Sequence, residues 1–131
     1  MRYLLILPLI FVNSLLSAAV YYVSPIGSDL SGDGTKANPW FTINKVWELL
    51  VPGDTLYMRG GTYFYNSTQH LTGKNGTSVN RIKIWAYPGE KPVITKSNSY
   101  SYAQGSGIYF TGNYFHWKGI EITGFKQIDA F

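Results

Sequence analysis

The most reactive side chains that stand together are those of His116, Trp117 and Lys118, which are consecutive. A lysine in such a cluster can act as a base, and a tryptophan can stack on a sugar ring. No known motif surrounds the three residues, so we favour a structural interpretation, with an outward lysine and a stacked aromatic on a strand face. His70 and His116 lie in unrelated contexts without a nucleophile motif, which argues against a Ser/His/Asp triad.

The chain carries seven carboxylates, of which only two lie close together in sequence. The seven are Asp29, Asp33, Glu48, Asp54, Glu90, Glu121 and Asp129. A calcium ion needs a cluster of oxygen ligands, but residues 29–35 do not match the spacing of an EF-hand loop. We therefore expect Asp29 and Asp33 to stabilise a turn, with calcium ligation as the alternative. We predict no catalytic residue and no metal ligand in this chain, and the substrate-binding residues remain unassigned.

The composition excludes several classes of protein. With no cysteine among 131 residues, disulfide scaffolds and cysteine-ligated metal sites are ruled out. Aromatic residues make up 17% and charged residues 14%, which is too apolar and too weakly charged for a disordered chain. The net charge of +4 suits an acidic partner, but no nucleic-acid-binding motif is present, so we expect no nucleic acid.

The first 19 residues have the layout of a secretory signal. Arg2 supplies a positive charge, an apolar run follows at 3–16, and the small residues Ser17, Ala18 and Ala19 precede the expected cleavage site. The alternative is a membrane anchor, but the apolar run is shorter than the ~20 residues that a span requires. The sequence predicts a secreted, extracellular protein without a stable membrane anchor after cleavage.

The chain after the signal combines one short helix with many short strands. Apolar residues at i, i+3, i+4 and i+7 predict an amphipathic helix over 43–50, capped by Thr42 and ended by Pro52 and Gly53. From Asp54 onward the pattern alternates and predicts strands. These lie at 20–23, 54–58, 62–65, 81–87, 92–95, 107–110, 114–118 and 119–123, with polar loops at 66–80 and 96–106.

A rough repeat relates these strands. Leu56, Ile84 and Trp117 occupy equivalent places in three alternating strands, 28 and 33 residues apart. Each strand is followed by a glycine-containing turn and a second short strand, as in the turns of a β-solenoid. Because one such turn cannot bury its inward side chains alone, the turns must stack. Periodicity alone leaves an ordinary antiparallel sandwich as the alternative.

Five segments of the chain resemble the opening of secreted right-handed parallel β-helix proteins. Within this architecture, they resemble the pectate lyases of the polysaccharide lyase family 9 type. The segments are YYVSPxGSD at 21–29, GT at 34–35 with NPWxTI at 38–43, PGDTLYxRGGTY at 52–63, AYPGExPVI at 86–94 and GIEITG at 119–124. They cover nearly all of the chain after the signal, and they are more specific for the architecture than for the reaction.

This resemblance implies an all-β fold, a right-handed parallel β-helix. The expected domains are a signal peptide at 1–19, a strand, loop and capping helix at 20–53, and about three initial coils at 54–131. The helix would cover the open end of the solenoid, where unpaired backbone groups invite edge-to-edge association. Gly60 and Gly61 would provide the positive φ or the close backbone approach of a sharp corner.

The resemblance also implies a function. Lyases of this type cleave pectate-like acidic polysaccharides by elimination: calcium on the uronate carboxylate acidifies the C5 proton, and a lysine or arginine removes it. Family members carry the calcium aspartates and the catalytic lysine on later coils, and no position here matches those motifs. We therefore expect calcium to serve the full-length lyase and not to bind within this chain. The alternative function is a non-catalytic extracellular protein that binds carbohydrate.

The last residues of the chain and the polar loop at 66–80 raise two further expectations. Residues 125–131 form neither a helix cap nor a closing loop, so we expect an incomplete fragment that self-associates when expressed alone. Asn66 and Asn75 begin N-glycosylation sequons, which matter only in a eukaryotic secretory pathway.

Overall fold

The computed structural model describes residues 17–99 and 107–125. The predicted signal peptide therefore lies outside the described residues except for 17–19, as does the end of the chain at 126–131. The described elements are β1 (Val20–Val23), α1 (Ile43–Trp47), β2 (Thr55–Met58), β3 (Gly61–Tyr65), β4 (Gln69–Leu71), β5 (Ile82–Ala86), β6 (Pro92–Lys96), β7 (Ile108–Phe110), β8 (Phe115–Lys118) and β9 (Glu121–Ile122). No helix in these two ranges is long and apolar enough to cross a membrane.

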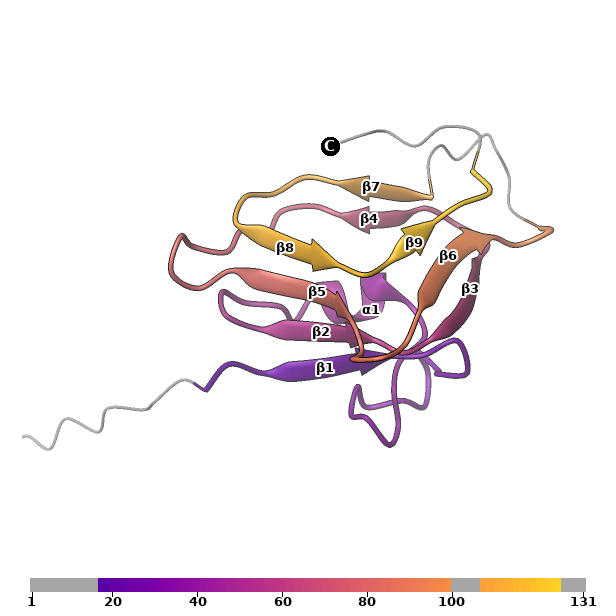
Figure 1. The fold of residues 1–131 in the computed structure, drawn as a ribbon, viewed down its shortest axis with the longest axis horizontal. Helices are drawn as coiled ribbons and strands as arrows, with labels where there is room; N and C mark the ends of the chain where they lie inside the picture. The colour runs from indigo at the N-terminus through magenta and orange to yellow at the C-terminus, as the bar shows by residue number, and fades with distance from the viewer. Residues whose placement is uncertain (1–16, 100–106, 126–131) are drawn as a thin grey trace, which may run out of the picture.

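The strands form a parallel β-solenoid of about three turns (Figure 1). Sheet A has the order β1-β2-β5-β8, sheet B the order β3-β6-β9, and sheet C pairs β4 with β7. All the pairings between these strands are parallel, which excludes the antiparallel sandwich. The chain passes through the sheets in turn and returns one level higher, so each level lies on the one before it.

The predicted repeat matches the register of sheet A. Leu56 pairs with Ile84, and Ile84 pairs with Trp117. In sheet B, Thr62 pairs with Val93 and Val93 with Glu121. The two spacings, 28 and 33 residues, therefore correspond to successive turns of the solenoid, and their difference is absorbed by the loops.

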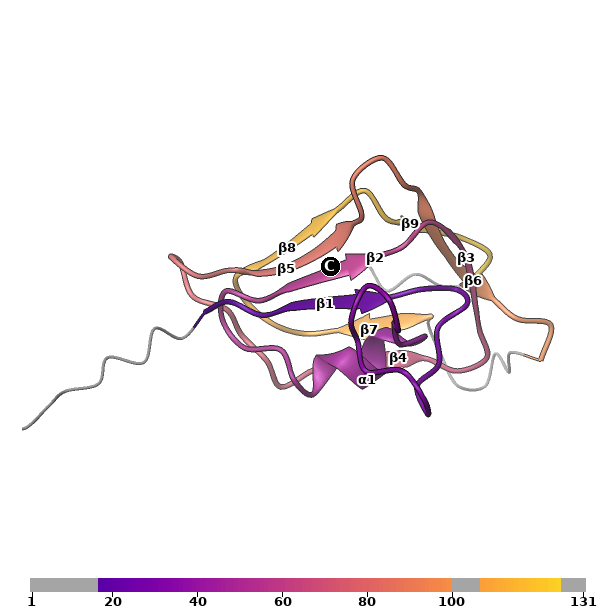
Figure 2. The same ribbon diagram turned by 90° about the horizontal axis from the view of Figure 1, so that it is seen from below.

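The core lies between the three sheets (Figure 2). Alternate residues of each strand point inward, and several aliphatic side chains there are fully buried, among them Val23, Leu56, Ile84, Ile94 and Leu71. Full burial of one such side chain stabilises the fold by about 1.5–3 kcal/mol. Stacked aliphatic positions thus hold the turns together in a chain without disulfides.

The predicted capping helix is confirmed but shorter than expected. It spans Ile43–Trp47, and Thr42 caps it by accepting a hydrogen bond from the backbone N–H of Lys45 at 3.2 Å. Leu50 lies beyond the helix and is still buried. Figure 2 shows α1 beside β4, where the side chain of Gln69 accepts a hydrogen bond from the N–H of Asn44 at 3.1 Å. The helix therefore covers the first edge of sheet C.

The corner between β2 and β3 uses both predicted glycines. Gly61 has φ +115°, which side-chain-bearing residues rarely adopt. A Cβ at Gly60 would lie 3.0 Å from the Cβ of Glu90 on the next turn. The corner therefore needs glycine for two separate reasons, one conformational and one steric.

One predicted loop is wrong in part. Residues 66–80 contain β4, which pairs with β7 and makes a third sheet. The segment looks polar because Gln69 is buried as a hydrogen-bonding residue, 2% exposed, rather than as an apolar one. The turn that contains β2 and β3 thus has three strands where the sequence pattern indicated two, whereas β7 lies within the strand predicted at 107–110.

Candidate functional site

The outward side of sheet A carries a row of aromatic rings and lysines. Leu56 and Ile84 point into the core, so the residues that follow them, Tyr57 and Trp85, point outward. The pairing places Tyr22 beside Tyr57, Tyr57 beside Trp85, and Trp85 beside Lys118. We call this surface the aromatic face and define it by Tyr22, Lys36, Tyr57, Lys83, Trp85, Tyr87, His116 and Lys118.

The rings of the aromatic face contact one another from turn to turn. Tyr22 and Tyr57 are stacked with centroids 5.8 Å apart, and Tyr57 meets Trp85 edge-on at 6.4 Å. Tyr87 lies 5.6 Å from Tyr57 and 6.2 Å from Tyr22. All four rings are partly exposed. Together they form a continuous aromatic surface that runs along the solenoid axis.

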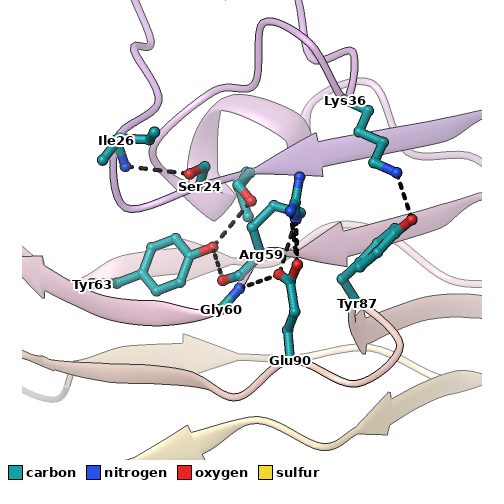
Figure 3. Close-up of polar contacts among 9 residues, drawn as sticks. Ser24, Ile26, Lys36, Arg59, Gly60, Tyr63, Tyr87 and Glu90 are labelled. Carbon is teal, nitrogen blue, oxygen red and sulfur yellow. Dashed lines mark hydrogen bonds and ion pairs between the residues drawn. The ribbon is translucent and has the colours of Figure 1, made fainter.

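Lysine side chains surround these rings. The Nζ atoms of Lys83 and Lys118 lie 5.5 and 5.3 Å from the Trp85 ring centroid, within the range of a cation–π interaction. Lys36, on the loop before α1, donates a hydrogen bond from Nζ to the Tyr87 hydroxyl at 2.6 Å (Figure 3). The aromatic face is therefore positively charged.

A hollow of about 270 Å³ opens on this face. Its lining includes Tyr57, Trp85, Tyr87, Glu90 and Lys118. A second hollow, of about 430 Å³, is lined by Ser24, Pro25, Ile26, Arg59, Gly60, Gly61 and Glu90. Glu90 thus contributes to the lining of both hollows.

Glu90 is held by a two-pronged ion pair with Arg59 (Figure 3). The nearest nitrogen–oxygen distance is 2.7 Å, and the other carboxylate oxygen accepts a bond from the N–H of Gly60 at 2.6 Å. The hydrogen bonds from Arg59, and then that from Gly60, lower the pKa of Glu90 to about 2. The guanidinium also lies 4.8 Å from the Tyr87 ring centroid. The carboxylate is therefore ionised but locally neutralised, and it does not oppose an anion on the aromatic face.

This arrangement suits a flat ligand that has apolar faces and carries negative charge. The rings offer dispersion and C–H contacts to one face of such a molecule, and the ammonium groups offer charge-assisted hydrogen bonds to its carboxylates. Partial exposure keeps both kinds of group accessible.

Asp29 and Asp33 have the turn-stabilising role that we favoured. Asp29 accepts hydrogen bonds from the N–H groups of Phe41 and Thr42 and from the Thr42 hydroxyl, at 2.6–2.9 Å. Asp33 accepts two from Thr35, which lower its pKa. Within the described ranges, no three His, Asp or Glu side chains gather as a metal site would require. The alternative of calcium ligation by this pair therefore has no cluster to support it.

The cluster at 116–118 divides between the two sides of sheet A. Trp117 packs against the core, 5.5 Å from the ring of Phe110. His116 and Lys118 are exposed, and His116 Nδ1 accepts a hydrogen bond from Trp85 Nε1 at 3.3 Å. Lys118 points outward as expected, whereas Trp117 is the inward equivalent of Ile84.

The other residues singled out by sequence lie away from this face. His70 is exposed on sheet C beside Tyr109, with ring centroids 5.9 Å apart. Asn66 and Asn75 are exposed, and the side-chain oxygen of Asn75 accepts a hydrogen bond from the N–H of Asn113 at 2.8 Å. None of the three contributes to the aromatic face.

Sequence reasoning did not single out Tyr57, Trp85 or Tyr87. A signal for two of them was present: Tyr57, Trp85 and Lys118 each follow by one residue the aligned positions Leu56, Ile84 and Trp117. Because neighbours in a strand point to opposite faces, the repeat that located the core also locates this outer row.

Comparison with known proteins gives consistent matches. The family described as "Pel9A-like, right handed beta helix region" matches residues 21–130. Pectate lyase L of Paenibacillus polymyxa is 34% identical over 118 residues, which cover 86% of this chain and 25% of that protein. The chain therefore spans about a quarter of the length of this curated relative.

Two solved structures are similar along most of the chain. A rhamnogalacturonan lyase has a TM-score of 0.63 at 25% identity, covering 80% of this chain and 28% of that one. The pectate lyase Pel9A has a TM-score of 0.58 at 25% identity, covering 79% and 28%.

Proposed function

Because this chain belongs to the Pel9A-like right-handed β-helix family, and so is kin to the polysaccharide lyases, we propose that it is the N-terminal part of a secreted lyase that cleaves an acidic, pectate-like glycan. The observation that carries this proposal is the family match along 21–130, together with relatives named for pectate lyase. The positive aromatic face supports the choice of an acidic substrate. The signal-like residues 1–19 support export.

The proposed reaction is calcium-assisted β-elimination, and the described residues do not fit a calcium site. The Asp29 carboxylate is occupied by three protein donors. Asp54 is 2% exposed and accepts bonds from the N–H groups of Ala19 and Val51. We therefore assign no catalytic step to this chain. We propose that the calcium ligands and the base belong to further turns, in the length that the relatives have beyond this match.

What this chain contributes is a folded start for the solenoid. Its α1 covers the first edge of sheet C, and its stacked strands offer a parallel template on which the next turn can pair. The proposed role of the described turns is to begin the β-helix and to present the aromatic face.

The test is an assay of the full-length gene product with polygalacturonate and calcium. Elimination creates an unsaturated sugar, so we expect ultraviolet absorbance to rise with time and to stop when calcium is chelated. The 131-residue chain alone should give no increase. A full-length protein that produces no unsaturated product from any uronate polymer would contradict the proposal.

The aromatic face also favours a second candidate, a non-catalytic extracellular protein that binds carbohydrate. Stacked rings with flanking lysines can bind a glycan without cleaving it. Measurable affinity of the full-length protein for a uronate glycan, with no turnover, would favour this candidate over the lyase.

A further inference from the structure

We propose that the hollow on the aromatic face binds a uronate residue of an acidic oligosaccharide directly, without calcium. The inference rests on the proposed function for the class of glycan, and it adds a recognition site in the first turns that is separate from the chemistry. The sugar ring lies against Trp85 and Tyr57, and its carboxylate faces the lysines.

The shape of the hollow fits one sugar ring. At about 270 Å³ it is slightly below the range of roughly 300–1,000 Å³ that drug-sized ligands occupy. Its lining includes the rings of Tyr57, Trp85 and Tyr87 together with Lys118. One pyranose ring with its carboxylate is the unit that this space accommodates.

The charges around the hollow favour an anion. In the part of the chain that the structure describes, the ion pair is that between Arg59 and Glu90. The ammonium groups of Lys83 and Lys118 lie over the Trp85 ring, without a carboxylate partner among the described residues. A ligand carboxylate can therefore bind there without displacing a protein carboxylate.

Arg59 neutralises the carboxylate of Glu90 beside this hollow. Glu90 contributes to the lining and is ionised at neutral pH, so an unpaired Glu90 would repel a uronate. The bidentate contact with Arg59 neutralises it and holds it in place. Figure 3 shows the pair beside Tyr87, with Lys36 at the hydroxyl end of that ring.

The order of the rings gives the bound glycan a direction. Tyr22, Tyr57 and Trp85 stand on neighbouring strands, in register, at 5.8 and 6.4 Å. An oligosaccharide stacked on them runs across the strands, along the solenoid axis toward β8. Longer uronate chains should therefore bind more tightly than a single uronate.

The test is a calorimetric titration of the full-length gene product with trigalacturonate in excess EDTA. We expect binding that weakens with salt, because fixed charges contribute. Trp85→Ala and Lys118→Gln should each raise Kd by about tenfold, from loss of a stacking surface and of a charge-assisted hydrogen bond. Circular dichroism and thermal unfolding show whether each variant is folded. If Trp85→Ala is poorly folded, Lys118→Gln still tests the inference, because Lys118 is exposed.

Matched controls change the same residue types elsewhere. Lys45→Gln removes an exposed lysine on α1, and Tyr109→Ala removes an aromatic that is 45% exposed on sheet C. Neither should change Kd. No binding in EDTA, an unchanged Kd in folded Lys118→Gln, or equal binding of the neutral trisaccharide galactotriose would overturn the inference. Turnover by the full-length protein without this binding would support the lyase proposal and contradict the inference. Binding without turnover would support the inference and contradict the lyase proposal.

Discussion

Lys118 and Trp85 stand opposite each other on β8 and β5, and the ammonium group of Lys118 lies 5.3 Å from the centre of the Trp85 ring. The two residues are 33 positions apart, one turn of the solenoid. Their contact exists only because the turns stack in parallel register, which aligns outward residues as strictly as inward ones. The fold that forms the core therefore also forms the aromatic face.

Loss of the Glu90 carboxylate charge should destabilise the protein in a pH-dependent way. We expect Glu90→Gln to lower the free energy of unfolding by about 1–2 kcal/mol at pH 7, through loss of a bidentate, partly exposed ion pair. The folded pKa, about 2, lies below the ordinary value of 4.5. The stabilisation is therefore fully present above pH 4.5 and is lost as the pH falls toward 2. Urea unfolding of both proteins between pH 2 and 7 measures it.

A control for this prediction is Glu121→Gln, which removes an exposed carboxylate from β9. The free energy of unfolding of this variant should stay close to that of the wild type between pH 2 and 7. A Glu90→Gln deficit that is the same at pH 2 and pH 7 would contradict the assignment of the ion pair.

The inward ladder of sheet A predicts a large effect at Ile84. This side chain is fully buried and pairs with Leu56 below and Trp117 above. Ile84→Ala should cost about 2–5 kcal/mol and Ile84→Val about 0.5–1.5 kcal/mol in urea unfolding. Val79→Ala, at a position 86% exposed, should change the free energy of unfolding little. Equal effects at positions 84 and 79 would be incompatible with the stacked core.

The buried hydroxyl of Tyr63 connects the end of β1 to the corner between β2 and β3. Its single proton is shared between the carbonyl oxygens of Arg59, at 2.7 Å, and Val23, at 3.0 Å, and burial raises the pKa of Tyr63. Tyr63→Phe leaves both carbonyls without this donor, so we expect a loss of about 1–3 kcal/mol. Tyr109→Phe, at a largely exposed position, serves as the comparison in thermal unfolding. A Tyr63→Phe protein as stable as Tyr109→Phe would refute the bridging role.

Asp29 should stabilise the chain independently of calcium. Its three hydrogen bonds connect the loop to the start of α1, so Asp29→Ala should lower the free energy of unfolding by about 1–3 kcal/mol. The loss should be equal in EDTA and in millimolar calcium. If calcium raises the Tm of the wild type but not that of Asp29→Ala, then Asp29 is a metal ligand after all.

Much of the fold could be predicted because the solenoid repeats its inward positions. The alternation at Leu56, Ile84 and Trp117 gave the correct register of three strands. The helix was located by its apolar spacing and its Thr42 cap, although its end was placed too late. Of the two strands of sheet C, β7 was predicted, but β4 was missed because Gln69 is buried for its hydrogen bonds, which an apolar pattern does not register.

The aromatic face could be predicted only in part. The repeat predicts Tyr57, Trp85 and Lys118 as outward residues, because each lies one position after an inward residue of the repeat. The contact between Lys36 and Tyr87 does not follow from the repeat, because it joins residues 51 positions apart through a loop whose path has no periodicity. Arg59 and Glu90 lie 31 positions apart, close to one repeat, but only the corner geometry brings their charges together.

The most direct measurement is an amide chemical-shift map of the full-length gene product titrated with trigalacturonate in EDTA. We predict saturable shifts at the amides of Tyr57, Trp85, Tyr87 and Lys118, with none at Tyr109 on sheet C. Shifts confined to other sheets, or an unchanged spectrum at millimolar ligand, would show that the outer side of sheet A is not a uronate-binding surface.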